Sequence, residues 1–214
     1  MKNRILVGFL LFLALPVILF NAKIFGAVLV GTYIILLGEI HLSLVNKHGN
    51  FSRTNKTALI YSLLLIPSLV CAYYLRVHFF EGLILILLGT AINDIAPYFI
   101  GKKFGKTPFF QSVSPNKTQE GAIAGLTTTF IFFAVVSAAF WSYNASILFL
   151  WVLIVIFGTL GDLLASKFKR INNVKDFSNL LGEHGGLLDR IDSHLATIPV
   201  SFLYFWIAGF IKPF

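Results

Sequence analysis

Residues 121–161 read GAIAGLTTTFIFFAVVSAAFWSYNASILFLWVLIVIFGTLG and contain no acidic or basic side chain. A helix crosses the hydrocarbon core of a bilayer with about 20 largely apolar residues, so this stretch is too long for a single crossing. Its middle, WSYN at 141–144, combines aromatic residues typical of a membrane interface with residues typical of a turn. We therefore expect a hairpin of two membrane-spanning helices, at 121–141 and 145–165.

The rest of the chain has the same membrane character. Of its 214 residues, 57% are hydrophobic and 12% are charged, whereas about 25% of residues are charged in soluble domains. This composition excludes a water-soluble globular protein, because its polar residues are too few to cover a surface in water. Cys71 is the single cysteine, which excludes a disulfide framework within the chain and a cysteine-based zinc site.

Further apolar segments predict membrane spans elsewhere. They lie at 5–20, 24–45, 58–75, 80–100 and 193–211. The first follows Lys2 and Arg4, as in a signal peptide, but no A-x-A-like cleavage site comes after it, so we expect it to be retained. We predict an all-α, polytopic integral membrane protein with about seven transmembrane helices, built as a single membrane domain over residues 1–214.

The basic residues predict the orientation of these spans, because Lys and Arg are retained on the cytoplasmic side. With the N-terminus inside, the cytoplasmic side holds fourteen of the 17 basic residues and the outside holds three. The fourteen are Lys2, Arg4, Lys47, Arg53, Lys56, Lys102, Lys103, Lys106, Lys117, Lys167, Lys169, Arg170, Lys175 and Arg190. The three are Lys23, Arg76 and Lys212. We therefore expect an N-in, C-out topology with the polar chemistry at the cytoplasmic face.

The predicted cytoplasmic segment 166–192, SKFKRINNVKDFSNLLGEHGGLLDRID, concentrates polar residues. It holds five cations, four acids, one histidine and three glycines. Lys and Arg attract phosphate oxygens, and consecutive glycines let backbone N–H groups approach an anion. The segment therefore predicts a polyphosphate site. Taken alone, its basic residues also fit a flank that contacts anionic lipid, and His184 also fits a structural role.

Acidic residues in and beside this segment predict a metal site. Carboxylates beside a phosphate require a cation between them, and Mg²⁺ is commonly held by one or two Asp together with substrate phosphates. Asp162, near the cytoplasmic end of the sixth span, and Asp189, which enters the seventh, are the candidate ligands. A carboxylate such as Asp162 that borders an apolar helix is costly and usually functional. Asp189 and Asp192 are three residues apart, so we expect them on one helical face.

Two features that precede this segment in the sequence are interpreted separately. Ser114 precedes Pro115, a pattern typical of a helix N-cap followed by proline at the first helical position. We expect a helix that opens there, with Lys117 and Thr118 in its first turn, where backbone N–H groups favour an anion. Glu39 in the second span fits a snorkelling carboxylate or a partner of His41 as well as a functional acid.

Two blocks of motif residues carry a family resemblance. The first block comprises Asn93-Asp94, Tyr98, Gly101-Lys102, Phe104-Gly105-Lys106 and the run from Ser114 to Gly121. The second comprises Ser166, Lys169-Arg170, Lys175-Asp176, Ser178, Gly182, His184-Gly185-Gly186, Asp189-Arg190 and Asp192. Residues 90–192, which contain both blocks, resemble the phosphatidate cytidylyltransferases, or CDP-diacylglycerol synthases. Glu39 is similar to an acidic residue in an early helix of that family, while Ile95, Pro97 and Glu183 depart from its pattern.

The resemblance implies an activity, ligands and a location. The reaction is a Mg²⁺-dependent transfer of the cytidylyl group from CTP to phosphatidic acid, which yields CDP-diacylglycerol and pyrophosphate for phospholipid synthesis. K⁺ is a candidate for a second, monovalent cation. The resemblance also implies a homodimer among the lipids of a bacterial inner membrane, with the active site facing the cytoplasm, and no nucleic acid as a partner.

The same resemblance assigns roles to residues. Asp162 and Asp189 are expected to bind the metal. The residues expected to neutralise phosphate oxygens are Lys169, Arg170, Lys175 and Arg190. His184 is expected to position a phosphate or to transfer a proton. The other expected substrate contacts are Asp94, Ser114, Lys117, Thr118, Ser166, Asp176, Gly185, Gly186 and Asp192.

Two other functions fit parts of the sequence. A CTP-dependent enzyme acting on an isoprenoid, archaeol-type phospholipid performs similar chemistry, although the His-Gly-Gly and Ser-Pro-x-Lys-Thr blocks favour the diacyl enzyme. An ion-coupled secondary transporter would use Glu39, Asp94 and Asp162 as coupling residues within the membrane. That function predicts acids near the bilayer midplane and an inverted repeat, whereas these acids lie at span ends and no repeat is visible.

Overall fold

The computed structural model describes residues 18–45, 51–110, 113–114, 117–140, 145–182 and 185–212. Its helices are α2 (Ala22–Val45), α3 (Phe51–His78), α4 (Phe80–Phe104), α5 (Gln119–Phe140), α6 (Ala145–Ile171) and α7 (Leu188–Ile207). Across these described ranges, the β-type pairing found is one isolated antiparallel bridge between Pro108 and Thr118. The expected all-α class is therefore confirmed for this part of the chain.

The predicted spans correspond to these helices. The long apolar stretch is divided as expected, since α5 ends at Phe140 and α6 begins at Ala145, although the turn itself lies outside the described residues. Four segments of the described chain are long and apolar enough to cross a membrane. They are Ala22–Leu42, Phe80–Phe104, Gln119–Ala139 and Ser146–Ile171. Residues 5–17 of the first predicted span lie outside the described residues.

The starts of two predicted spans differ clearly from the structure, and the helix predicted at 145–165 continues to Ile171. Spans were expected at 58–75 and 193–211, but α3 begins at Phe51 and α7 begins at Leu188. After one apolar residue, the first turns of both helices are rich in polar residues, so hydropathy alone places their starts too late. At the other end, α7 stops at Ile207, and the chain turns at Gly209 with a positive φ of 77°.

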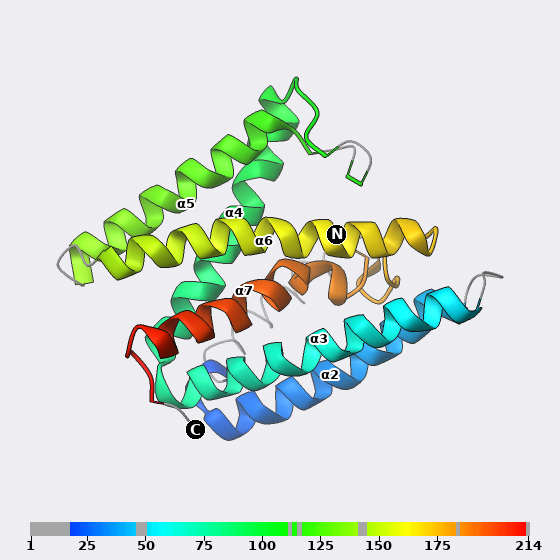
Figure 1. Ribbon diagram of the computed structural model, residues 1–214, viewed down its shortest axis with the longest axis horizontal. Helices are drawn as coiled ribbons and strands as arrows, with labels where there is room; N and C mark the ends of the chain where they lie inside the picture. The colour runs from blue at the N-terminus through cyan, green and yellow to red at the C-terminus, as the bar shows by residue number, and fades with distance from the viewer. Residues whose placement is uncertain are drawn as a thin grey trace, which may run out of the picture.

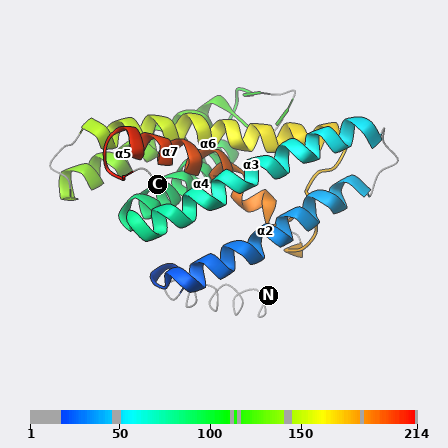
Figure 2. The same ribbon diagram turned by 60° about the horizontal axis from the view of Figure 1, so that its bottom comes forward.

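The helices pack as neighbouring pairs around α7. In Figure 1, α2 lies beside α3 and α5 beside α6, while α7 runs between α6 and α3. Helix α4 crosses this layer and contacts α3, α5, α6 and α7. The turned view in Figure 2 shows the same grouping of helices. Helices that alternate in direction bring the α4–α5 and α6–α7 connections toward one end of the bundle, where the motif residues lie.

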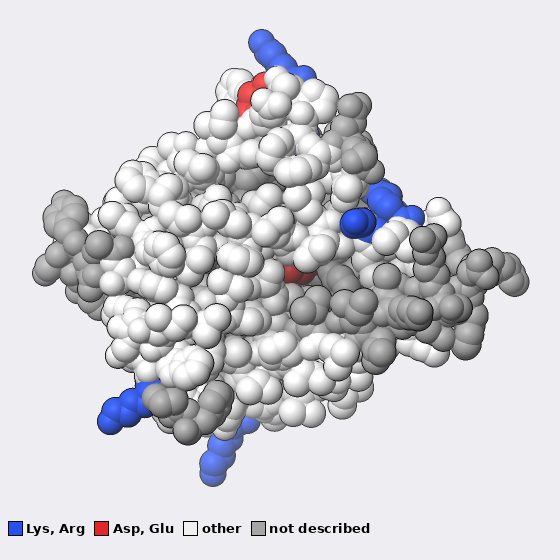
Figure 3. Space-filling model, viewed as in Figure 1, with Lys and Arg blue, Asp and Glu red and all other residues white. Residues whose placement is uncertain are grey.

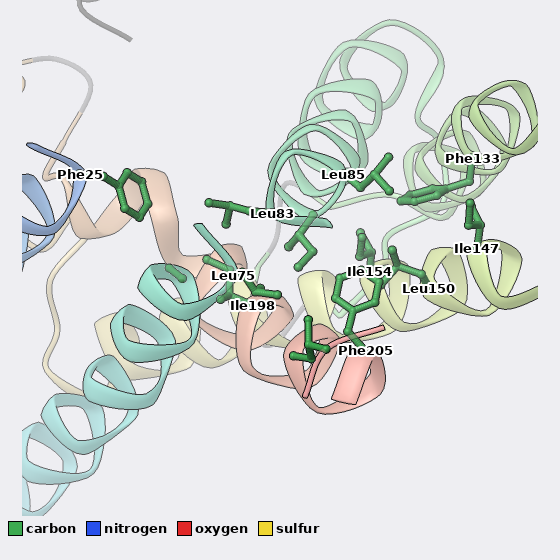
Figure 4. Close-up of a cluster of buried hydrophobic side chains, with 13 residues drawn as sticks. Phe25, Leu75, Leu83, Leu85, Phe133, Ile147, Leu150, Ile154, Ile198 and Phe205 are labelled. Carbon is green, nitrogen blue, oxygen red and sulfur yellow. The ribbon is translucent and has the colours of Figure 1, made fainter. Parts of the chain in front are cut away.

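Two apolar clusters hold the helices together. The larger cluster draws side chains from all six helices and includes Phe133, Ile154 and Phe205 (Figure 4). Close approach of the backbones supports it, because a Cβ on Gly89 of α4 would lie 2.7 Å from the Phe133 ring. The smaller cluster joins α2, α3, α6 and α7 to the segment before α7, and its members are Leu36, Ile40, Leu65, Ala165, Phe168, Phe177 and Leu188.

The outer surface is apolar as well. Large hydrophobic side chains are exposed on every described helix, among them Ile34, Val135 and Ile207. On the face shown in Figure 3, basic side chains stand mainly at the margins, and the broad area between them shows one small acidic patch near its centre and otherwise no charged side chain. Such a continuous apolar surface would be unstable in water. The chain is therefore an integral membrane protein.

The packing at Gly89 generates a stability test with a matched control. Gly89→Ala places a methyl group 2.7–2.8 Å from the Phe133 ring, which we expect to destabilise the fold by about 1–3 kcal/mol. Gly31→Ala in α2 meets no atom within 4 Å, and a helical Gly→Ala change stabilises by roughly 0.5–1 kcal/mol. Thermal unfolding in detergent should therefore show a lower Tm for Gly89→Ala and an equal or higher Tm for Gly31→Ala. Equal shifts in both variants would contradict this packing.

Candidate active site

A cavity of about 570 Å³ opens between α4, α5 and α6. Its polar lining contains the candidate residues Asp94, Lys117, Thr118 and Asp162. The rest of the lining is Asn93, Pro97, Tyr98, Lys102, Phe109, Gly121, Ala122 and Thr159. Cations, carboxylates and aromatic rings therefore share one concave surface, as is common for sites that bind small charged ligands.

An ion pair crosses this cavity. The Lys117 Nζ lies 2.5 Å from Asp162 Oδ2, and about a quarter to a third of each side chain is exposed. Ser166, one helical turn further along α6, donates a longer hydrogen bond of 3.4 Å to Asp162 Oδ1. Because the pair is partly exposed, an incoming anion can compete for the ammonium group and a cation can compete for the carboxylate.

The loop before α5 positions Lys117. Phe109 N–H donates to Lys117 O at 2.8 Å, and Gln119 N–H donates to Thr107 O at 2.9 Å, so the chain is extended on both sides of the bridge. Thr118 Oγ1 then accepts the Gly121 N–H at 3.2 Å, which makes Thr118 the N-cap.

This arrangement corrects the predicted start of the helix. The Ser-Pro pattern placed the N-cap at Ser114, but α5 begins at Gln119. The antiparallel bridge to Pro108 keeps Thr118 extended, so the helix cannot begin earlier. Lys117 consequently precedes the helix and extends across the cavity rather than lying in the first turn.

Two further carboxylates, one from α4 and one from α7, interact electrostatically with Asp162 of the ion pair. Asp94 on α4 accepts a hydrogen bond from the Ser193 hydroxyl at 3.0 Å, and Asp192 on α7 accepts the Ser193 N–H at 2.8 Å. The charge of Asp162 on α6 acts on both Asp94 and Asp192. Since like charges in an apolar setting repel strongly, cations beside these acids stabilise their charged forms.

Asp189 forms a second polar centre at the start of α7. Lys169 Nζ donates to Asp189 Oδ1 at 2.7 Å, and the N–H groups of Phe177 and Gly186 each donate to Asp189 Oδ2 at 2.9 Å. The Lys169 charge also acts on Asp192. Lys169 thus acts electrostatically on both acids of α7, and the charged side chains of the two centres form one polar network that is coupled by charge.

The two glycines before α7 differ from the expected phosphate cradle. Gly185 N–H donates to Gly182 O at 3.2 Å, and Gly186 N–H donates to Asp189, so neither is directed at a ligand. Gly185 has a positive φ of 78°, which strains other residues. A Cβ on Gly186 would lie 2.7 Å from Glu39 Oε1. In this structure the glycines permit tight packing of the turn.

The remaining candidates lie in the loops and in the helix turns next to them. Arg170, Lys175, Asp176 and Arg190 are exposed. Ser114 lies in the loop before Lys117 and is partly buried. His184 lies outside the described residues.

The sequence left some contributors unassigned. Glu39 accepts hydrogen bonds from Ser178, Leu187 and Leu188, a set of partners that no local pattern predicts. Ser193 supports Asp94, and Thr159 lines the cavity. Thr159 lies three residues before Asp162 on α6, so helical spacing from a candidate acid could have found it.

The donors available to a cation are carboxylates of the network. In the described part of the chain, no group of three or more His, Cys, Asp or Glu side chains is spaced to hold a metal ion on its own. Asp162 nevertheless opens into a cavity beside Asp94 and already pairs with an ammonium group there. Hard oxygen donors completed by substrate phosphates are the usual surroundings of Mg²⁺, so these residues fit that ion.

Curated relatives are similar to this chain over part of their length. A phosphatidate cytidylyltransferase of Aquifex aeolicus (strain VF5) is 40% identical over 143 residues, which cover 66% of this chain and 54% of the relative. One of Bacillus subtilis (strain 168) is 41% identical over 125 residues, 55% of this chain and 44% of the relative. One of Pseudomonas aeruginosa is 46% identical over 123 residues, 56% of this chain and 45% of the relative. The matches thus span about half the length of these relatives.

The family comparison covers nearly the whole sequence. The profile of the Cytidylyltransferase family matches residues 2–208. This match includes every described helix and both polar centres. The chain therefore belongs to the cytidylyltransferase family.

Proposed function

We propose that the protein is a CTP:phosphatidate cytidylyltransferase, which joins CTP and phosphatidic acid into CDP-diacylglycerol and releases pyrophosphate. The observation that carries this proposal is the polar network, in which the Lys117–Asp162 ion pair lies in the cavity and the Lys169–Asp189 ion pair lies at the start of α7. It lies at one end of an apolar helix bundle, where a phosphate on a membrane lipid and a water-soluble nucleotide can meet. Family membership and the names of the relatives support the same reaction.

The chemistry requires positioning and charge neutralisation more than covalent catalysis. An oxygen of the lipid phosphate attacks the α-phosphorus of CTP, and the bond from that phosphorus to the bridging oxygen of pyrophosphate breaks. Lys117 and Lys102 in the cavity would bind phosphate oxygens on one side, and Lys169 would bind them on the other. The exposed basic residues would raise the local concentration of anionic substrates; they are Arg170, Lys175 and Arg190. The remaining polar candidates would orient these cations and the substrates, and they are Asp94, Ser166, Asp176 and Asp192.

Mg²⁺ is the proposed cofactor. Asp162 is its primary ligand in this proposal, because its carboxylate lines the cavity and is partly exposed there. Asp189 is the second ligand, although its oxygens already accept bonds from Lys169, Phe177 and Gly186, so Lys169 must move to release Oδ1. When bound, the ion would neutralise negative charge on the leaving pyrophosphate. K⁺ remains a candidate for a second cation beside the surplus carboxylates.

The proposed membrane placement has seven spans with the N-terminus in the cytoplasm and the C-terminus outside. Helices α3 and α7 supply two spans in addition to the four most apolar segments, and the residues before α2 supply the first. The loops at 105–118 and 172–187 then face the cytoplasm, where CTP is present, in a bacterial inner membrane. A homodimer is part of this proposal through the family resemblance.

The other functions have less support. A secondary transporter is not favoured by a family profile that describes a cytidylyltransferase. Asp94 and Asp162 also open into a cavity at one end of the bundle, whereas coupling ions in transporters bind near the midplane. An enzyme for isoprenoid phospholipids shares the cation requirements, but the relatives reported above are named for phosphatidate.

A substrate-resolved assay tests the reaction. Purified protein in detergent, given labelled CTP, Mg²⁺ and phosphatidate, should form a CDP-lipid and pyrophosphate in equal amounts. Diacylglycerol should give no product, because it lacks the attacking phosphate. Product from an archaeol-type phosphate alone would favour the isoprenoid enzyme, and no product from any phosphate lipid would refute the proposal.

The carboxylates of the network should be essential for turnover. Asp162→Asn and Asp189→Asn should each lower kcat by about 10²–10³-fold, since each removes charge stabilisation at the reacting phosphates. Glu81→Gln is the matched control, because Glu81 is an exposed carboxylate in the first turn of α4, at the opposite end of the helix from the cavity. Wild-type rates for either Asp variant, measured on folded protein, would remove that residue from the site.

Cysteine labelling tests the orientation. In a Cys71→Ser background, Lys167→Cys and Lys212→Cys each introduce one thiol at an exposed position. In intact cells a membrane-impermeant maleimide should label residue 212 and reach residue 167 only after permeabilisation. The reverse pattern would overturn the N-in, C-out topology.

A further inference from the structure

Glu39 is a buried carboxylate that makes long-range hydrogen bonds to the motif loop. It lies on α2 with 3% of its surface exposed. Its Oε1 accepts the Ser178 hydroxyl and the Leu187 N–H, each at 2.7 Å, and its Oε2 accepts the Leu188 N–H at 2.8 Å. Its partners are more than 130 residues away in the sequence, so these bonds close a contact between distant parts of the fold.

The surroundings of Glu39 are apolar. Leu36 and Ile40, its neighbours on α2, belong to the smaller core cluster, together with Phe177 from the loop and Leu188 from α7. A carboxylate in such a setting is stable when several donors surround it, because each hydrogen bond offsets part of the lost hydration. The burial therefore favours one arrangement of the loop, in which Ser178 and the α7 N-terminus both reach Glu39.

Glu39 and Asp189 together accept hydrogen bonds from the three backbone N–H groups that lead into α7. The N–H of Gly186 donates to Asp189, and the next two N–H groups along the chain donate to Glu39. These groups have no partner within a helix, and negative charge beside them is favourable. Since the same turn holds Asp189, which contacts Lys169, a shift at Glu39 would be transmitted to the polar network.

We propose that Glu39 is a positioning residue for the reaction: from α2 it holds the turn before α7 so that Asp189 and Lys169 keep the geometry that turnover requires. This inference rests on the proposed function. Glu39 acts through the loop and touches neither substrate nor metal. Gly186 is part of the same arrangement, because any Cβ at that position would lie 2.7–2.9 Å from the Glu39 carboxylate.

Variants of Glu39 separate positioning from general stability. Glu39→Gln keeps an oxygen acceptor for Ser178 and Leu187 but sets an amide N–H against the Leu188 N–H. Glu39→Met removes all acceptors and keeps the apolar bulk. Ser178→Ala removes one donor and preserves the carboxylate, so it remains available if a Glu39 variant does not fold. The matched control is Ser68→Ala, because the Ser68 hydroxyl also reaches α7, donating to Leu195 O at 2.6 Å, away from the turn.

Hydrogen–deuterium exchange and steady-state kinetics are measured on each purified variant. We expect faster exchange in peptides covering 176–189, with unchanged exchange in α4 and α5. The expected fall in kcat is about 10-fold for Glu39→Gln and 100-fold for Glu39→Met, with a smaller change in the KM for CTP. Ser178→Ala should show the same exchange pattern to a smaller degree, and Ser68→Ala should leave exchange at 176–189 and kcat unchanged.

The results that would contradict the role of Glu39 differ from those that would contradict the proposed function. Exchange that rises throughout the protein, or a kcat per folded molecule equal to wild type, would mean that Glu39 serves stability alone and would overturn the proposal. If the wild-type protein forms no CDP-lipid, the proposed function fails, and the exchange data alone decide whether Glu39 holds the turn. Exchange at 176–189 that is unchanged in Glu39→Met would refute that role in either case.

Discussion

Carboxylates between apolar helices persist only where cations or hydrogen-bond donors lie beside them, and this constraint governs the polar end of the protein. Asp94, Asp162 and Asp192 come from three helices and act on one another through their charges. Lys117 pairs with the acidic group from the α4–α5 loop, and Lys169 acts on it from α6. The helices can bring these acids together because the α4–α5 loop and the last turn of α6 supply compensating charge.

The same constraint explains how the loops are held. A long loop in water would sample many conformations, but here each loop is fixed by groups that require partners. The extended pairing of Phe109 with Lys117 aims one cation across the cavity. The bonds to Glu39 and Asp189 fix the start of α7. The apolar helices thus supply a rigid frame, and the hydrogen bonds and ion pairs of the acids fix the charged residues in defined positions on it.

The sequence predicted the elements better than their contacts. The hairpin between α5 and α6 follows from apolar length and a turn at 141–144, and both are local signals. The starts of α3 and α7 were placed too late because their polar first turns carry no hydropathy signal. The N-cap was placed at Ser114 instead of Thr118, since the bridge to Pro108 is a nonlocal contact that overrides the local Ser-Pro pattern.

The candidate site shows the same difference between local signals, which the sequence reveals, and long-range contacts, which it does not. The motif residues were found because cations, acids and glycines are concentrated in two short blocks. The glycines before α7 suggest a phosphate cradle in the sequence, yet their N–H groups bond within the protein, and Gly186 leaves room for Glu39. The partners of Glu39 follow from the contact of α2 with the segment that leads into α7, which a single sequence does not contain. Clusters of charged residues can therefore be recognised in the sequence, whereas hydrogen bonds between distant residues can be identified only in the folded structure.

The central claim is that the cavity and the turn before α7 form one site for the nucleotide and its metal. The most direct measurement is an experimental structure with Mg²⁺ and a non-hydrolysable CTP analogue. The account predicts that the triphosphate lies between Lys117 and Lys169, with the ion on Asp162. Nucleotide bound elsewhere, such as in the apolar groove between α2 and α3 lined by Leu29, Tyr33 and Tyr73, would contradict it.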